Sequence, residues 1–307
     1  MASTPMGLSE LITINNENLS GGVVNELLQD APLVRAMAAI QASNGTNHSF
    51  LRYDSPPTVG FRGVNDGRDF DASSDTTVDI TCKILDASFS MDVQVARGYR
   101  GGPEALLQRE ASRHMRSAFQ TLEQQLIYGT DLNANGFAGI YQHVGALSNE
   151  MVFDGGGTEN LSSVLLIRST DPLTTAAIVT GNDGNITMDP AVLQRVAGST
   201  GFYGAYFQNI SSWYAYQHAS KYSVCRIANI DSTGNVVDDD LIAEALAAFP
   251  ADRQPNMVVM NRPLQRQLRQ SRTATNPTGQ PAPFPTEVFG LPVIITDQLS
   301  TNETAVV

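Results

Sequence analysis

Lysine is scarce in this 307-residue sequence, since only Lys83 and Lys221 occur and acidic residues outnumber basic ones by 31 to 19. Proteins that hold nucleic acid by its phosphates rely on clustered lysine and arginine, so a formal charge of −12 argues against that class of binding. No stretch approaches the ~18 consecutive apolar residues of a membrane-spanning helix. The N-terminus also lacks the basic and apolar regions of a signal peptide. We therefore expect no membrane contact.

Cysteine is equally rare, and Cys82 and Cys225 have no metal-ligand spacing, so reduced thiols are expected. The four histidines share no zinc-site spacing, and nucleophile-elbow and phosphate-loop motifs are absent. The stretch DLNANG at 131–136 matches the first half of a calcium-binding loop, but its twelfth position is Gln142, which supplies no carboxylate. The sequence therefore predicts no enzyme, no metal site and no cofactor.

A long amphipathic helix is the clearest structural pattern. Pro103 suits the first helical position, and Gly129 suits the residue after the last turn. Between them, apolar residues recur at steps of three and four: Leu107, Ala111, Met115, Ala118, Phe119, Leu122 and Leu126. The pattern predicts about 26 helical residues, or roughly 39 Å. A long helix with a single apolar face is more typical of a flat subunit that packs against its neighbours than of a compact enzyme.

Residues 50–99 have the pattern of strands instead. The Asp66-Gly67 pair signals a tight turn, and apolar and polar residues alternate after it. The alternation changes phase between Ile84 and Leu85, which predicts an extra residue and a bulge or bend there. We expect a long β-ribbon that changes its buried side halfway along and projects between subunits.

Other segments are read more briefly. Helical patterns at 19–28 and 32–40 indicate an arm rather than a core. Strands are expected at 164–167, 176–179 and 257–260, and a helix capped by the acidic run 238–240 is expected to reach residue 249. Aromatic residues gather in 202–230, where we expect core packing or a subunit contact.

Four arginines follow the last of these strands, and their spacing places them on one helix face. They are Arg262, Arg266, Arg269 and Arg272. Three readings are open: a solvated face, intersubunit ion pairs in an otherwise acidic protein, or contact with nucleic acid.

Several segments, in this order, resemble the major capsid proteins of tailed bacteriophages. LIYG at 126–129, followed by FAGI at 137–140, resembles the exit of the family's spine helix. FRGVNDG at 61–67 resembles the motif that opens the extended loop in the podophage-like branch, and MDV at 91–93 resembles its close. RIANID, MNR and GLPV follow at 226–231, 260–262 and 290–293.

The resemblance implies an α+β fold of the Hong Kong 97 type, in a shell protein without catalysis that self-assembles into the icosahedral head around a tailed phage's genome. It also implies five segments. These are an N-terminal arm (1–50), an extended β-hairpin loop (51–100), a peripheral domain with the spine helix (101–150), an axial domain (151–287) and a C-terminal strand returning to the peripheral domain (288–307).

The implied partners are further copies of the chain in hexamers and pentamers, a portal and, in some shells, a decoration protein. The family's scaffolding-like N-terminal extension is missing, so we expect a separate scaffolding protein or a removed extension. Assembly would take place in the bacterial cytoplasm, and the shell in the virion would enclose DNA without sequence-specific binding.

The resemblance and the arginine pattern together give the candidate intersubunit residues: Phe61, Arg62, Asn65, Asp66, Arg68, Lys83, Asp92, Arg262, Arg266 and Arg269. Some relatives join subunits by a Lys–Asn isopeptide bond, and Lys83 lies in the matching loop. Nothing else in the sequence identifies a partner asparagine or a catalytic glutamate for that bond.

Two other functions are open at this stage. An encapsulin nanocompartment shell would share the fold, and cargo enzymes in purified particles would favour it. A glycan-binding tail or adhesin protein would use the aromatic segment 202–222, and glycan binding by dispersed monomers would favour that function.

Overall fold

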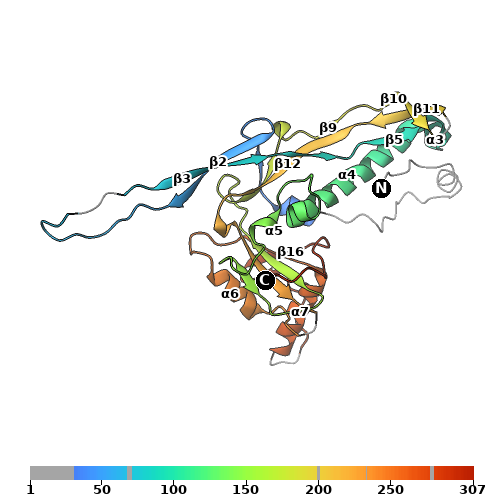
Figure 1. The fold of residues 1–307 in the computed structure, drawn as a ribbon. Coiled ribbons are helices and arrows are strands. Elements are labelled where there is room, and N and C mark those ends of the chain that lie inside the picture. The colour runs from blue at the N-terminus through green and yellow to red at the C-terminus, as the bar shows by residue number, and fades with distance from the viewer. Residues whose placement is uncertain (1–30, 68–70, 199–200, 233, 277–279) are drawn as a thin grey trace.

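The computed structural model describes residues 31–67, 71–198, 201–232, 234–276 and 280–307. The helix expected at 19–28 and the candidate residue Arg68 lie outside these ranges. The described chain forms an elongated upper layer with a hairpin projecting from one end, and a rounder body below it (Figure 1). No described helix is long and apolar enough to cross a membrane.

The predicted long helix is confirmed as α4, Pro103–Tyr128, and runs along the upper layer (Figure 1). Gly129 ends it with a φ of 58°, and a Cβ added there would lie 2.1 Å from the backbone nitrogen of Gly139. Glycine is therefore required at this exit both for its left-handed backbone and for the close approach of a neighbouring segment.

The apolar stripe of α4 faces the core as its periodicity predicts, with Leu107, Ala111, Leu122 and Leu126 buried. Towards the C-terminal end the buried face widens beyond the stripe. It then also includes Glu123, Gln125 and Ile127. Two of these added residues are polar, so the apolar pattern alone could not reveal them.

The projecting hairpin consists of β2, Asn47–Ser55, and β3, Ser74–Thr81, which pair antiparallel. Its outermost turn closes with a hydrogen bond of 3.3 Å from the Asp66 amide to the Gly63 carbonyl, and Asn65 has a φ of 70°. The turn expected at Asp66-Gly67 thus lies slightly earlier in the chain. Asparagine tolerates the left-handed conformation that the turn requires.

The ribbon changes its buried side as predicted, through a change of strand partner. After β3, the Cys82 amide donates to the Thr46 carbonyl, and β4, Lys83–Asp86, pairs with β12, Ile210–His218, instead of β2. Cys82 is buried and Ile84 is exposed. The break falls at Cys82, two residues earlier than expected, because the chain moves from the hairpin into another sheet there.

The helix expected at 32–40 is wrong in its second half. Helix α2, Pro32–Ala36, ends early, and β1, Ala39–Gln41, pairs parallel with β8, Ala176–Thr180. The edge of β8 supplies backbone partners that override the local helical pattern. Leu33 is fully buried, so this segment is also packed into the core.

The upper layer contains two sheets. One has the order β1-β8-β12-β4, with β9 also paired to β12, and the other has the order β10-β11-β5. The strands and helices not yet bounded are β5 Phe89–Asp92, α3 Val93–Gly98, the 3-10 helices η1 Gly129–Asp131 and η2 Asn182–Gly184, α5 Ile140–His143, β9 Thr187–Met188, β10 Val192–Gly198 and β11 Gly201–Gln208.

The lower body is built on a sheet with the order β15-β16-β14-β7-β13-β6. Helices α6 and α7 pack with one face of it through residues such as Ile242, Leu264 and Leu268, and the α4 side packs with the other through Leu165 and Val259. The elements are β6 Val152–Asp154, β7 Ser162–Ile167, η3 Lys221–Ser223, β13 Val224–Ile230, α6 Asp239–Ala247, β14 Met257–Met260, α7 Arg262–Ala274, β15 Glu287–Val288 and β16 Leu291–Ile295.

Both helices of the lower body start where the sequence predicts. The Asp238 carboxylate accepts a hydrogen bond from the Leu241 amide at 2.8 Å, so the acidic run does cap α6. The Asn261 side chain accepts from the Leu264 amide at 3.0 Å and caps α7. Local capping preferences fix these starts.

Candidate intersubunit surfaces

The tip of the hairpin is the most exposed apolar surface of the described chain. Phe61 has a relative exposure of 110%, Val64 92% and Val59 84%. Closer to the body, Leu51 and Tyr53 are exposed as well. Within the described residues these side chains are largely uncovered, and apolar surface of this kind marks an interaction site.

The tip is nevertheless held in shape by polar contacts. The Arg62 guanidinium donates to the Asp66 carbonyl at 2.9 Å. The Asp71 carboxylate accepts from the Thr58 hydroxyl at 2.9 Å, and this bond lowers the pKa of Asp71. The turn therefore presents Phe61 outward without support from the body of the protein.

Two further candidates of the extended loop have different surroundings. The carboxylate of Asp92 accepts a hydrogen bond of 2.7 Å from the Gln94 amide and caps α3, which is a local role. Lys83 is exposed on β4 and lines a cavity of about 480 Å³ beside the root of β3. Its ammonium makes no ion pair within the described residues.

The arginines of α7 divide into two groups. Arg272 is paired with Asp239 at 2.6 Å, which raises its pKa, and Arg269 donates to the Ala282 carbonyl at 2.7 Å. Arg262 lies 3.7 Å from Asp297 in an exposed pair, and Arg266 is exposed without an ion pair to the described residues. Arg262 and Arg266 are therefore the two that another molecule can reach most easily.

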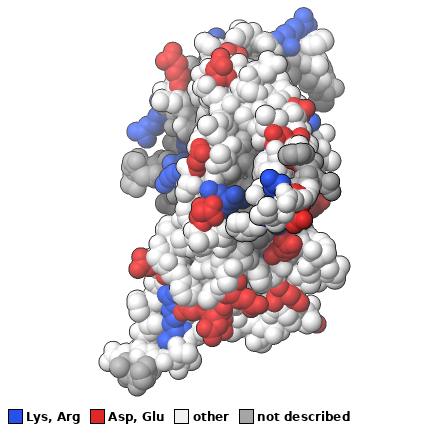
Figure 2. All heavy atoms as spheres, turned by 90° about the vertical axis from the view of Figure 1, so that its left-hand side faces the viewer, with Lys and Arg blue, Asp and Glu red and all other residues white. Residues whose placement is uncertain are grey.

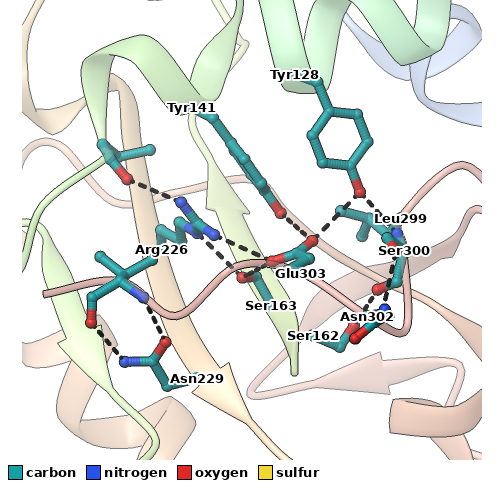
Figure 3. Close-up of polar contacts among 12 residues, drawn as sticks. Tyr128, Tyr141, Ser162, Ser163, Arg226, Asn229, Leu299, Ser300, Asn302 and Glu303 are labelled. Atoms are coloured by element: carbon teal, nitrogen blue, oxygen red, sulfur yellow. Dashed lines mark hydrogen bonds and ion pairs between the residues drawn. The ribbon is translucent and has the colours of Figure 1, made fainter. Parts of the chain in front are cut away.

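A buried ionic cluster lies where the C-terminal segment crosses α4, α5 and the lower sheet (Figure 3). Arg226 on β13 and Glu303 form a salt bridge of 3.0 Å, and both side chains are about 95% buried, with relative exposures of 4% and 5%. The hydroxyls of Tyr128 and Tyr141 donate to the Glu303 carboxylate at 3.3 and 2.7 Å. The Ser163 hydroxyl donates to it as well, at 2.6 Å.

Every polar group of the Arg226–Glu303 cluster has a partner in Figure 3. Arg226 also donates to the Ser163 hydroxyl at 3.0 Å, and its guanidinium lies 3.6 Å from the centre of the Tyr141 ring. Burial, followed by the charge of Glu303, raises the pKa of Tyr141 well above its usual value, so this hydroxyl keeps the proton that it donates. A buried pair is tolerated only with such complete hydrogen bonding.

The end of the chain is fixed beside this cluster. The side chain of Asn229 donates to the Val306 carbonyl and accepts from the Val306 amide, at 2.9 and 2.8 Å (Figure 3). Sequence reasoning missed the role of Glu303, because it stands in the polar stretch 300–304. Arg226 was visible in the sequence as the first residue of RIANID and as a charged residue in a largely apolar segment, but neither signal pointed to Glu303 as its partner.

A second buried carboxylate joins the arm to the long helix. Glu123 accepts hydrogen bonds from the Leu33 and Val34 amides at 2.9 and 3.3 Å, and from the Thr296 hydroxyl. Burial raises the pKa of Glu123, and these hydrogen bonds oppose that rise. One side chain thus ties α2, α4 and the C-terminal segment together.

The loop that resembles half of a calcium site is used internally. Gln142 at the twelfth position donates to the Asp131 carboxylate at 2.9 Å and to the Tyr128 carbonyl at 2.8 Å. No group of three or more His, Cys, Asp or Glu side chains suited to a metal is found in the described part of the chain.

The face of the molecule seen from the hairpin end carries many acidic side chains, spread over the upper layer and also gathered on the lower body (Figure 2). Helix α6 of the lower body has the exposed acidic residues Asp240 and Glu244. Acidic surface of this kind repels phosphate groups, which agrees with the charge balance of the whole sequence.

Comparison with known proteins gives one family and several structures. Residues 15–307 match the family described as major capsid protein GP7. The bacteriophage Epsilon15 structure is 15% identical with a TM-score of 0.72, and the match covers 100% of this chain and 98% of the other. No curated protein matches the sequence.

Two capsid structures of bacteriophage JBD30 are also similar. The first is 12% identical with a TM-score of 0.52, covering 97% of this chain and 99% of the other. The second, a capsid decorated with minor capsid protein trimers, is 13% identical with a TM-score of 0.53, covering 94% and 98%. At these identities the structures show the fold, and the fold agrees with the Hong Kong 97 type that the sequence predicts.

Proposed function

The chain belongs to the major capsid protein GP7 family, and on this premise we propose that its copies join as hexamers and pentamers through the projecting hairpin. As a member of this family it is a structural protein of the bacteriophage head. Its surfaces must therefore bind other copies of the chain. The hairpin tip is the best candidate, because its apolar side chains are the most exposed ones in the described part of the chain.

The observation that carries this proposal is that the hairpin projects away from the described body of the chain, with its apolar tip at the far end (Figure 1). Phe61 and Val64 stand at the far end of a two-stranded ribbon, which is at best marginally stable alone. A second copy that covers the tip would bury these side chains and stabilise the ribbon.

Charge supports a head-to-tail arrangement of copies. The hairpin, residues 47–81, carries six aspartates against three arginines. The opposite end of the upper layer, where α3 and the start of α4 lie, has five arginines against two glutamates within residues 93–118 (Figure 1). An acidic end and a basic end on one elongated chain suit a heterologous contact, in which different surfaces of two copies meet.

Other partners complete the proposal. Residues 1–50 would act as an arm, 51–100 as the extended loop, 101–150 as the peripheral domain, 151–287 as the axial domain and 288–307 as the returning strand. A separate scaffolding protein and a portal would assist assembly in the host bacterial cytoplasm. A decoration protein would bind the finished shell, as minor capsid protein trimers do in JBD30.

Two open alternatives are less well supported. An encapsulin shell would share the fold, but the family match is to a phage capsid protein. A glycan-binding protein would use free aromatic faces in segment 202–222, where Tyr214 and Tyr216 are buried and Trp213 packs against the core, while Phe202 and Phe207 on β11 are exposed. The buried rings serve packing, and the two exposed ones suit a subunit contact as well as a ligand.

Replacing Phe61 and Arg62 together by alanine is expected to leave the subunit folded and to impair assembly. Both side chains lie outside the core, while the double change removes the exposed ring and the bond that shapes the turn. Circular dichroism and particle counts by electron microscopy would measure the two effects. Leu173→Ala is the matched control, because Leu173 is also exposed but lies in a different turn. Normal particles from the double variant would contradict this use of the hairpin.

A further inference from the structure

Three of the four histidines gather at the root of the hairpin, where it joins the body. His48 lies on β2, His143 on α5 and His218 on β12. The fourth, His114, lies elsewhere and stacks on Phe89. No spacing in the sequence brings the three together; the fold does.

His143 and His218 are stacked face to face. Their ring centroids lie 4.5 Å apart with an interplanar angle of 5°. The Tyr216 hydroxyl lies 3.4 Å from Nδ1 of His218. Burial lowers the pKa of His143, and burial, followed by the charges of His143 and Arg52, lowers the pKa of His218 to about 3. At neutral pH both rings are therefore uncharged and can remain in contact.

His48 has a hydrogen-bond partner at each ring nitrogen. The Ser43 amide donates to Nδ1 at 3.3 Å, and Nε2 lies 2.8 Å from Oε1 of Gln217. The buried Gln217 in turn donates to the Pro172 and Thr175 carbonyls, which fixes its orientation. These bonds connect β2 of the hairpin to β12 of the body.

The hairpin meets the stacked pair across the cavity of about 480 Å³. Residues 78–81 of β3 line this cavity together with His143, Tyr216 and His218. The stacked rings of His143 and His218 therefore face the root of the hairpin. A second link is the hydrogen bond between Gln217 on β12 and His48 on β2.

The charged groups around the pair would not compensate for its protonation. Lys83 of β4 lines the same cavity, and Arg52 of β2 acts unfavourably on a charged His218. Asp79 of β3 also lines the cavity, but its carboxylate already accepts from the Ser49 hydroxyl. Within the described residues neither histidine forms an ion pair with a carboxylate.

We propose that the root of the hairpin is a proton-operated joint, in which the neutral stacked pair of His143 and His218 supports the hairpin against the body and mild acid weakens that support. Two cations in a face-to-face stack would repel each other, so the closed joint resists protonation, whereas rings freed from the stack take up protons at their ordinary pKa; acid therefore favours the open joint. The joint is a property of the single chain. Its consequence for the shell, a loosened intersubunit contact in acid, rests on the proposed function of the hairpin.

The direction of the effect follows from the lowered pKa values of His143 and His218. A histidine whose pKa is lower in the folded chain than in the free one stabilises the fold above the ordinary value of about 6.5, and that stabilisation is lost as the pH falls. The closed joint is thus complete at neutral pH and weakens progressively below about pH 6.5.

Hydrogen exchange of the whole chain at about pH 7.5 and about pH 5 tests this joint, after correction for the intrinsic pH dependence of exchange. Amides at the root, within 47–50 and 78–81, are expected to lose protection by about tenfold or more at the lower pH, since each unit below the ordinary pKa contributes up to tenfold per histidine. Amides of β7 and β14 in the lower sheet are the internal reference. Equal loss in those strands would show general unfolding and overturn the proposal.

A pair of variants separates the joint from other acid effects. His143→Phe with His218→Phe keeps two stacked rings without titration, and is expected to remove most of the acid-induced loss at the root. His114→Phe is the matched control, and this variant is expected to lose protection at the root in acid as the wild-type chain does.

If the double variant does not fold, a titration of the wild-type histidines by NMR decides instead. Two histidines that stay neutral below pH ~6 support the joint, and ordinary titration of all four overturns it.

Particle imaging at neutral pH distinguishes a failure of the proposed joint from a failure of the proposed intersubunit role of the hairpin. Shells that form while root protection is the same at both pH values would overturn the joint and leave the proposed function standing. A chain that shows the acid-dependent loss but forms no oligomers would support the joint and contradict the proposed function.

Discussion

Replacing Arg226 by methionine is expected to lower the free energy of unfolding by about 3–5 kcal/mol, which makes it one of the two most damaging single changes considered for this chain. Methionine fills the space but leaves the buried Glu303 carboxylate without its cation. Because domains of this kind have a net stability of only ~5–15 kcal/mol, the variant should unfold at much lower denaturant concentration. Denaturant unfolding of dispersed subunits, followed by circular dichroism, measures the change.

Two controls separate a buried ion pair from ion pairs in general. Lys221→Met breaks the pair between Lys221 and Glu150, whose side chains are 57% and 78% exposed, and should leave the stability almost unchanged because solvent screens such a pair. Adding Glu303→Gln to Arg226→Met replaces the unpaired buried carboxylate with a neutral amide and should recover part of the stability. If Arg226→Met proved no worse than Lys221→Met, the assignment of the cluster as the anchor of the C-terminal segment would fail.

Leu122→Ala is expected to cost about 2–5 kcal/mol, because it leaves a cavity in the main core. Leu122 has a relative exposure of 2% and packs in the cluster that joins α4 to the sheets. The expected result is thermolabile or insoluble protein. A thermal unfolding scan of the soluble fraction, read together with the yield, measures the loss.

The control for this change lies on the opposite face of the same helix. Ser117 is exposed, and Ser117→Ala should alter the stability by less than about 0.5 kcal/mol, as surface substitutions usually do. The contrast tests which way the helix faces. A larger loss from Ser117→Ala than from Leu122→Ala would mean that the apolar stripe does not face the core.

Features encoded by neighbouring residues were predictable from the sequence. The ends of α4 follow from Pro103 and Gly129, and its buried face follows from the spacing of its leucines. The starts of α6 and α7 follow from Asp238 and Asn261. In each case the interaction that fixes the helix end or the buried face is made by residues within one or two helical turns, so it can be predicted from the sequence.

Features that depend on distant partners were not predictable in the same way. Strand β1 forms because β8 offers an edge 139 positions later in the chain, where Ala39 pairs with Ile178, and not because of any alternation within residues 39–41. Glu303 and Arg226 meet across 77 positions. A tertiary contact of this kind leaves no periodic trace in the chain.

The candidate contact residues show the same division. The apolar hairpin tip was visible in the sequence because Phe61 stands beside a strong turn signal, and the structure leaves it fully exposed. Arg269 looked equivalent to Arg266 on the helical wheel, yet it is held by the Ala282 carbonyl of a loop 13 residues later. Spacing identifies a helix face, whereas the loop that covers part of it is known only from the fold.

Sedimentation of the purified chain, with negative-stain electron microscopy of the same sample, shows whether the chain assembles with its own copies. We expect rings or closed shells, because the hairpin tip exposes apolar surface that the described part of one chain leaves uncovered. A stable monomer of 33.0 kDa under all salt conditions, with no particles on the grid, would contradict it.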